Sequence, residues 1–159
     1  AALGTHRLIA GEHEVVLAST EEILALEQKM LSSWCKATWQ RGLVFLATGA
    51  FDDAIPFLKR ALSWRIEAAV PIWLATYLPY CGVLLARQGG HERAVELLAL
   101  GLTSPHRRLL EIDPLLTRTR TELEEVLGDE RYAAAWERGR RLDVQATATE
   151  VLAELESLS

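Results

Sequence analysis

The segment from Cys81 to Leu100 reads CGVLLARQGGHERAVELLAL, and the segment 40 residues before it, from Arg41 to Arg60, reads RGLVFLATGAFDDAIPFLKR. Small residues recur at the same places in both, and each time they accompany a helix-forming stretch, a short turn and a second helix-forming stretch. They are Gly42, Gly49 and Ala54 in the first segment and Gly82, Gly89 and Ala94 in the second. A fixed period of this size indicates a stacked array of helical hairpins, and such arrays usually bind other proteins.

The composition agrees with an all-α fold. Of 159 residues, 50% are hydrophobic and 25% are charged, which is enough apolar material for a substantial core. Helix formers dominate, and the alternating Val, Ile and Thr runs that predict strands are missing. A net charge of -5 argues against a nucleic acid as the direct partner. Cys35 and Cys81 have no second cysteine nearby, so we expect reduced core residues.

No apolar run approaches the roughly 18 residues that a membrane span needs, and the N-terminal AALGTHRL lacks the apolar core of a signal peptide. We therefore expect a cytoplasmic protein that does not enter a membrane. The chain starts without Met and enters an amphipathic helix almost at once, which suggests a fragment of a longer chain whose first helices lack a neighbour.

Breaks in the hydrophobic pattern predict one helical domain with four parts. The domain covers 1–159, with a partial repeat at 1–31, repeats at 32–68 and 71–104, and capping helices at 105–159. The partial repeat is expected as a helix from Glu12 to Met30, with a break or cap at Ser19-Thr20.

Caps and prolines mark the helices of the two repeats. Ser32-Ser33 is expected to cap the first helix, and Pro56 to lie in the first turn of its partner. Pro71 opens the next helix, and Pro79 should bend that helix because it removes a hydrogen bond.

The 40-residue period is lost beyond Pro105. The remaining sequence predicts helices at Pro114 to Leu127, Tyr132 to Leu142 and Val144 to Leu158, with a turn at Gly128-Asp129. Because a terminal repeat must present a polar outer face, these helices are expected to cap the array.

The two repeats resemble the tetratricopeptide pattern. The residues that carry the resemblance are Thr38, Arg41, Gly42, Phe45, Ala54, Leu58 and Ala61, then Leu78, Cys81, Gly82, Leu85, Ala94 and Leu98. Gly42 and Gly82 would let the helices of a hairpin approach closely, and Ala54 and Ala94 would make room for a large neighbour. Thr38 and Leu78 stand where the pattern usually has Trp, and the distance between the two repeats exceeds the usual ~34 residues. HEAT-like pairs have a closer period but lack this Gly-to-Ala arrangement.

The resemblance implies antiparallel helical hairpins stacked as a right-handed α-solenoid with a C-terminal helical cap. A second resemblance is to the C-terminal part of large bacterial signal-transduction ATPases and transcriptional regulators. It is carried by the stretch Gly89 to Leu102 and by Ala135, Trp136, Gly139, Arg140 and Leu142. In those proteins, tetratricopeptide-like repeats act as sensor and scaffold behind a nucleotide-binding switch.

No catalytic motif is present in the sequence, and we expect no enzyme activity, no cofactor and no metal. His13-Glu14 would need a second His at position 17 to resemble a zinc-protease helix, and that position is Leu17. Phosphate-binding glycine loops and a GxSxG elbow are also missing. The cluster of Arg138, Arg140 and Arg141 has acidic residues interleaved around it, which favours an ordinary salt-bridged surface.

The tetratricopeptide resemblance implies a partner-binding groove lined by the first helix of each hairpin. The candidate residues are Lys36, Trp39 and Leu43 in the first repeat, and Thr76, Val83 and Arg87 in the second, flanked by Tyr77 and Tyr80. Trp and Tyr are favoured interface anchors, and Lys36 and Arg87 could hold a carboxylate. The alternative is that Trp34, Trp39 and Trp73 fill gaps between helices.

Three functions remain open at this point. The first is a module of a regulator that binds a protein or peptide, including other domains of the parent chain. The second is a sensor that encloses a small molecule in the helical groove. The third is a structural module that joins copies into a homodimer.

Overall fold

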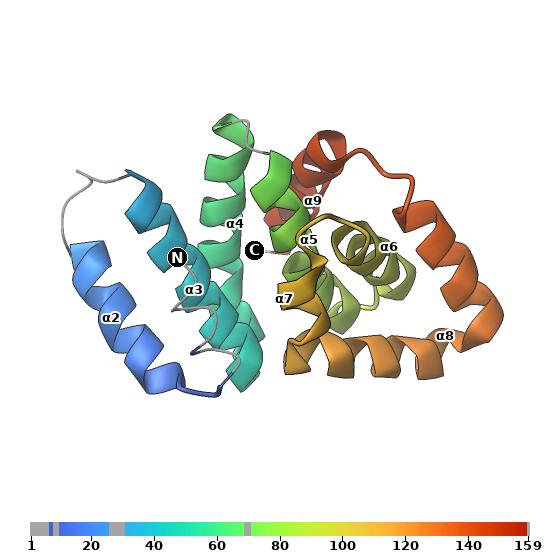
Figure 1. Cartoon of the computed structure of the whole chain (residues 1–159), viewed down its shortest axis with the longest axis horizontal. Coiled ribbons are helices and arrows are strands. Elements are labelled where there is room, and N and C mark those ends of the chain that lie inside the picture. The colour runs from blue at the N-terminus through green and yellow to red at the C-terminus, as the bar shows by residue number, and fades with distance from the viewer. Residues whose placement is uncertain (1–6, 8–9, 26–30, 69–70, 159) are drawn as a thin grey trace. The chain divides into compact units, whose positions relative to one another are not determined.

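The computed structural model describes residues 7, 10–25, 31–68 and 71–158, and these residues include eight helices and no strand. Figure 1 shows how the helices follow one another along the chain. The all-α prediction is confirmed. The helices are α2 (His13–Ala25), α3 (Leu31–Thr48), α4 (Phe51–Glu67), α5 (Pro71–Arg87), α6 (His91–Leu102), α7 (Arg107–Glu111), α8 (Pro114–Gly139) and α9 (Val144–Ser157). The chain divides into two compact units, Ala1–Trp64 and Arg65–Ser159, which we describe separately.

In the first unit, α2 packs against α3, and α3 forms a hairpin with α4. The hairpin turns at Gly49, which has a φ of 81°, a value that glycine adopts without strain. A Cβ atom on Gly42 would lie 2.7 Å from Cδ2 of Leu58, so the missing side chain does bring the two helices close. Ala54 is fully buried. The predicted close approach at Gly42 and the predicted turn at Gly49 are confirmed.

In the second unit, α6 packs between α5 and α8, and α9 lies against α5. Gly82 approaches α6 closely, since a Cβ atom there would lie 3.2 Å from the carbonyl oxygen of Ala94. In the same way, a Cβ atom on Gly101 of α6 would meet the ring of Pro79. A Cβ atom on Gly139 of α8 would meet the backbone of Glu96. These contacts leave most of α6 buried, so it is the centre of this unit.

The helix ends follow the predicted turn chemistry in the second unit. The α5–α6 turn passes through Gly89 with a φ of 87°, and α6 ends at Leu102. Asp113 and Asp143 cap α8 and α9 through side-chain oxygens that accept hydrogen bonds from backbone N–H groups, both at 2.8 Å. The predicted turn at Gly128 is confirmed as a sharp break inside α8, with φ 72° and ψ 163°.

Three local predictions differ from the structure. Helix α2 continues through Ser19-Thr20, because both hydroxyls donate to carbonyls of the preceding turn, at 3.0 Å each, and need no break. Its predicted end at Met30 lies outside the described residues. Helix α3 begins at Leu31, so Ser32-Ser33 lies inside its first turn.

Pro56 lies beyond the first turn of α4, where it is exposed, so that water can solvate the carbonyl that it leaves without a helical partner. The short helix α7 was not predicted, since its five residues RRLLE are too few for a periodic pattern. Within the described part of the chain, no helix combines the length and apolar character that crossing a membrane requires.

Candidate functional site

The groove residues predicted in the first repeat all lie on α3. Trp39 and Leu43 are buried, each with 6% of its surface exposed, whereas Lys36 is half-buried. The burial of Trp39 therefore supports the alternative that this residue fills a gap between helices.

The groove residues predicted in the second repeat lie on α5. Tyr77, Tyr80 and Val83 are buried, Thr76 donates a hydrogen bond to the carbonyl of Trp73 at 2.8 Å, and Arg87 pairs with Glu122 at 3.2 Å. The polar groups of Thr76 and Arg87 thus have partners within the second unit. The Tyr77 hydroxyl also lies 3.4 Å from Nε of Arg65, which donates to it.

Tyr80 joins α5 to the start of α8. Its hydroxyl donates to Oδ2 of Asp113 at 2.7 Å, while Oδ1 of the same carboxylate accepts from the backbone N–H of Leu115. Burial raises the pKa of Tyr80 well above its usual value, and the neighbouring carboxylate raises it further. The phenol therefore stays protonated at neutral pH and acts as a structural donor.

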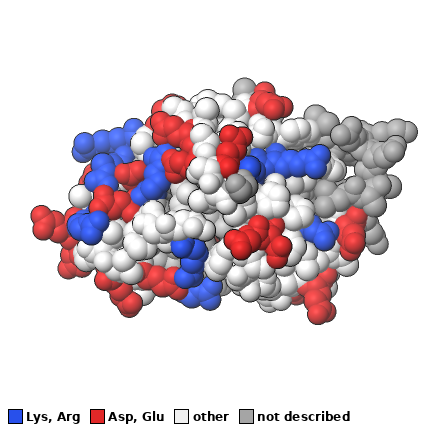
Figure 2. Space-filling model, turned by 180° about the vertical axis from the view of Figure 1, so that it is seen from behind, with Lys and Arg blue, Asp and Glu red and all other residues white. Residues whose placement is uncertain are grey.

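The basic cluster near the end of α8 is salt-bridged, as predicted. Arg138 pairs with Glu92 at 2.7 Å and with Glu96 at 2.8 Å, and Arg140 pairs with Glu137 at 2.9 Å. Hydrogen bonds from Arg131 and Arg138 lower the pKa of Glu92. Figure 2 shows acidic and basic side chains intermixed over one face of the molecule.

The structure reveals a surface that the sequence analysis did not propose. On the α3–α4 hairpin, aromatic rings and arginine side chains form two neighbouring groups of contacts, which we together call the aromatic-arginine ladder. Its members are Trp34, Arg41 and Phe45 from α3, and Phe57, Arg60 and Trp64 from α4. All are half-buried except Arg60, which is exposed.

The contacts in the ladder run from one end of the hairpin toward the other. The ring centroids of Trp34 and Trp64 are 6.0 Å apart, and the guanidinium carbon of Arg60 lies 4.1 Å from the centroid of Trp34. Further along, the guanidinium carbon of Arg41 lies 5.6 Å from the centroid of Phe57, whose ring is 5.5 Å from that of Phe45. At exposed sites such cation–π contacts contribute roughly 0.5–1 kcal/mol each.

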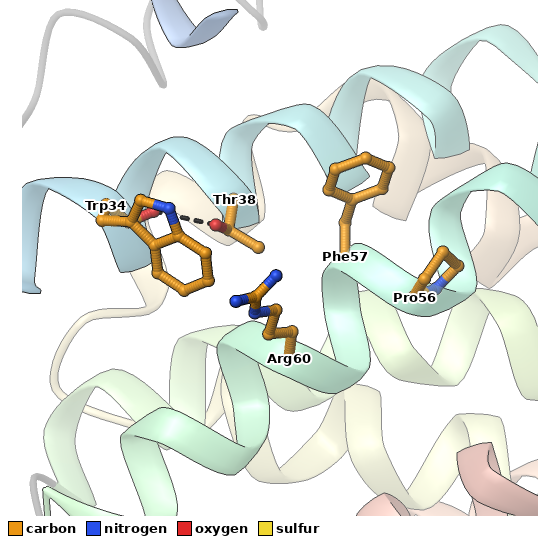
Figure 3. A pocket seen from close by; sticks show the side chains of 5 residues that line it. All are labelled: Trp34, Thr38, Pro56, Phe57 and Arg60. Atoms are coloured by element: carbon orange, nitrogen blue, oxygen red, sulfur yellow. Dashed lines mark hydrogen bonds between the residues drawn. The ribbon is translucent and has the colours of Figure 1, made fainter. Parts of the chain in front are cut away.

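The ladder borders a hollow of about 360 Å³. The residues that line it are Trp34, Thr38, Pro56, Phe57 and Arg60. In Figure 3, Arg60 extends from α4 toward α3, between the rings of Trp34 and Phe57. The hydroxyl of Thr38 donates to the carbonyl of Trp34 at 2.9 Å, so it is held by the helix beneath. Pro56 and Arg60 are exposed, which leaves the hollow accessible from solvent.

Helical spacing is the signal in the sequence that could have found the ladder. Trp34, Arg41 and Phe45 are separated by seven and four residues, and Phe57, Arg60 and Trp64 by three and four. Each set therefore lies on one side of its helix. These spacings do not predict how α3 and α4 align in the hairpin, and it is this alignment that brings the two sides together.

No family model, curated protein or solved structure matches the chain. Among the residues that the structure describes, no group of three or more His, Cys, Asp or Glu side chains could hold a metal ion. The fold defines a class of protein, an all-helical chain with closely packed hairpins. The aromatic-arginine ladder and its hollow form an accessible surface on the α3–α4 hairpin of that fold.

Proposed function

We propose that this chain is a tetratricopeptide-like binding module, without catalytic activity, that holds a segment of a partner protein on the aromatic-arginine ladder. The observation that carries the proposal is the open hollow between α3 and α4, where two aromatic rings and an arginine are held in place but remain partly accessible. Trp and Arg are among the residues that most often dominate the binding energy of protein interfaces.

The contacts among the ladder residues support this proposal. Binding loses affinity when flexible side chains must be ordered, and the ladder residues are already held by ring and cation–π contacts. The helices beneath them are fixed by the close approach of Gly42 to Leu58. A partner segment would therefore meet a surface whose shape is largely formed in advance.

The hollow also bears on the alternative of a small-molecule sensor. Its volume is near the lower end of the ~300–1,000 Å³ that is usual for small-molecule sites. Such sites enclose most of their ligand, whereas here Pro56 and Arg60 at the border are exposed. An open site of this kind suits a side chain that projects from a larger partner better than a free small molecule.

The arrangement of the repeats and the kind of parent protein are proposed from the sequence resemblances. The resemblance implies a right-handed tetratricopeptide-like solenoid capped by the C-terminal helices, and the close approach of helices at Gly42 and Gly82 supports its hairpins alone. The similarity to bacterial signal-transduction regulators then suggests a cytoplasmic scaffold or sensor, whose partner includes other domains of its parent protein. Homodimerisation is the structural alternative, and a solution mass that rises with concentration would favour it.

Selection from a randomised peptide display library tests the proposal. The intact protein and a Trp73→Ala control, which removes an exposed Trp of the second unit, should enrich the same family of peptides. Trp34→Ala should bind these peptides much more weakly while keeping its helical circular dichroism. Failure of the intact protein to enrich any family, or equal binding by Trp34→Ala, would contradict the proposal.

A further inference from the structure

The two arginines of the ladder differ from most arginines of the second unit. There, eight arginines pair with glutamates at 4.0 Å or less. They are Arg87, Arg93, Arg107, Arg118, Arg131, Arg138, Arg140 and Arg141. By contrast, Arg41 and Arg60 form cation–π contacts, and neither has an ion pair with any carboxylate in the described part of the chain.

Arg41 carries an additional unsatisfied group. Its Nε atom is buried and has no hydrogen-bond partner among the described residues. A buried donor without an acceptor costs folding free energy, so an acceptor supplied by a partner would offset that cost.

Stacking on an aromatic ring leaves the edge of a guanidinium free. The five N–H groups of arginine lie in one plane, and their arrangement matches the two oxygens of a carboxylate. Aromatic neighbours remove part of the water around the cation, and charge-assisted hydrogen bonds are stronger where water is reduced. Arg60 lies over Trp34 at the border of the open hollow, so the ring covers one face of its guanidinium while the side chain stays exposed.

We propose that Arg60 and Arg41 recognise an acidic side chain, Asp or Glu, of the bound partner segment, and that an apolar neighbour of that side chain packs against Trp34 and Phe57. The assignment rests on the proposed function and adds the chemistry of the partner to it. It follows from charge complementarity, because Arg60, a cation without a carboxylate partner in the described part of the chain, lines the hollow together with Trp34, Thr38, Pro56 and Phe57. Arg41 does not line the hollow but lies over the ring of Phe57, which does.

The test begins with the peptides selected by the intact protein. They should share an Asp or Glu beside an apolar residue. Exchange of that acid for its amide, Asn or Gln, should weaken binding about tenfold or more, as expected for the loss of a charge-assisted hydrogen bond. Affinity for the acidic peptide should also fall as the salt concentration rises.

Variants of the protein then locate the contact. Arg60→Gln should weaken the acidic peptide about tenfold or more but leave the amide peptide nearly unchanged. Arg60→Lys should restore only part of the affinity, because lysine keeps the charge but loses the planar donor pair. Arg41→Gln provides a second, independent variant. Arg108→Gln removes an equal charge from an exposed site on α7 and should leave binding unchanged.

The results separate this inference from the proposed function. Enriched peptides that lack a common acid would overturn carboxylate recognition and leave peptide binding intact. The same conclusion would follow if Arg60→Gln and Arg41→Gln bound the acidic peptide as well as the intact protein does. A phosphoserine peptide that binds more tightly than the acidic one would also overturn the assignment, in favour of phosphate. If the intact protein enriches no peptide at all, both proposals fail.

Discussion

Replacement of Gly139 by alanine tests the close packing of α8 on α6. A Cβ atom at Gly139 would lie 2.6 Å from Cα of Glu96 and 2.8 Å from Cβ of Ala99, and it would also meet the carbonyl oxygen of Glu96. Two of these atoms belong to the backbone of a buried helix, so no side-chain rotation can relieve the contact. The helices would have to move apart.

The sign of the effect distinguishes packing from helix propensity. Propensity alone predicts that Gly139→Ala stabilises the protein by up to about 1 kcal/mol, because glycine is a poor helix former. Overpacking of a filled interior costs about 1–3 kcal/mol and somewhat more where backbone must shift. We therefore expect a net loss of about 1–2 kcal/mol.

Urea unfolding followed by circular dichroism measures this difference. Ala133→Gly is a suitable control, because Ala133 is exposed on the same helix and reports propensity without packing. A Gly139→Ala variant that is as stable as the natural chain, or more stable, would refute the close approach of α8 to α6.

Two further predictions concern the same unit. Gly128→Ala should lower the free energy of unfolding by about 1–3 kcal/mol in urea titrations, because a φ of 72° with a ψ of 163° is accessible almost only to glycine; an unchanged midpoint would mean that α8 does not break there. Stability should also decline as the pH rises above 9, since burial raises the pKa of the Cys81 thiol from 9.0 to about 12 and raises that of Tyr80 as well. The folded state binds these protons more tightly than the unfolded chain does, so their contribution is complete below pH 9 and is lost as the pH approaches 12. The decline should be shallower in Tyr80→Phe, and equal stability at pH 9 and pH 12 in the natural chain would contradict the burial of both groups.

Several features of the fold could be read from local sequence. Gly49 and Gly89 predicted the hairpin turns, and both have the positive φ that such turns require. Pro71 predicted the start of α5, and Gly128 predicted the break in α8. These signals work because they depend on the conformational limits of single residues. The failed predictions at Ser19-Thr20 and Ser32-Ser33 were also local, but hydroxyl side chains suit helix interiors as well as caps, so their meaning depends on the surrounding chain.

The candidate site was less accessible to sequence reasoning. Trp39, Tyr77 and Tyr80 were proposed as groove residues because aromatic residues are common anchors at interfaces, yet all three are buried. An aromatic residue at a helical position looks the same in sequence whether it faces a partner or the core. Tyr80 illustrates the difficulty, because its hydrogen-bond partner, Asp113, is 33 residues away.

The sequence by itself determined the helices, their turns and the small residues at which helices meet, because backbone preference and the size of a side chain are properties of each residue and its near neighbours. The tertiary structure alone decided which side chains meet across those helices. The register of α3 against α4 placed Arg60 over Trp34, and the packing of α6 against α8 paired Arg138 with Glu92, 46 residues away. Partner choice depends on the relative rotation and height of two helices, and many small contacts summed over a whole interface set these quantities.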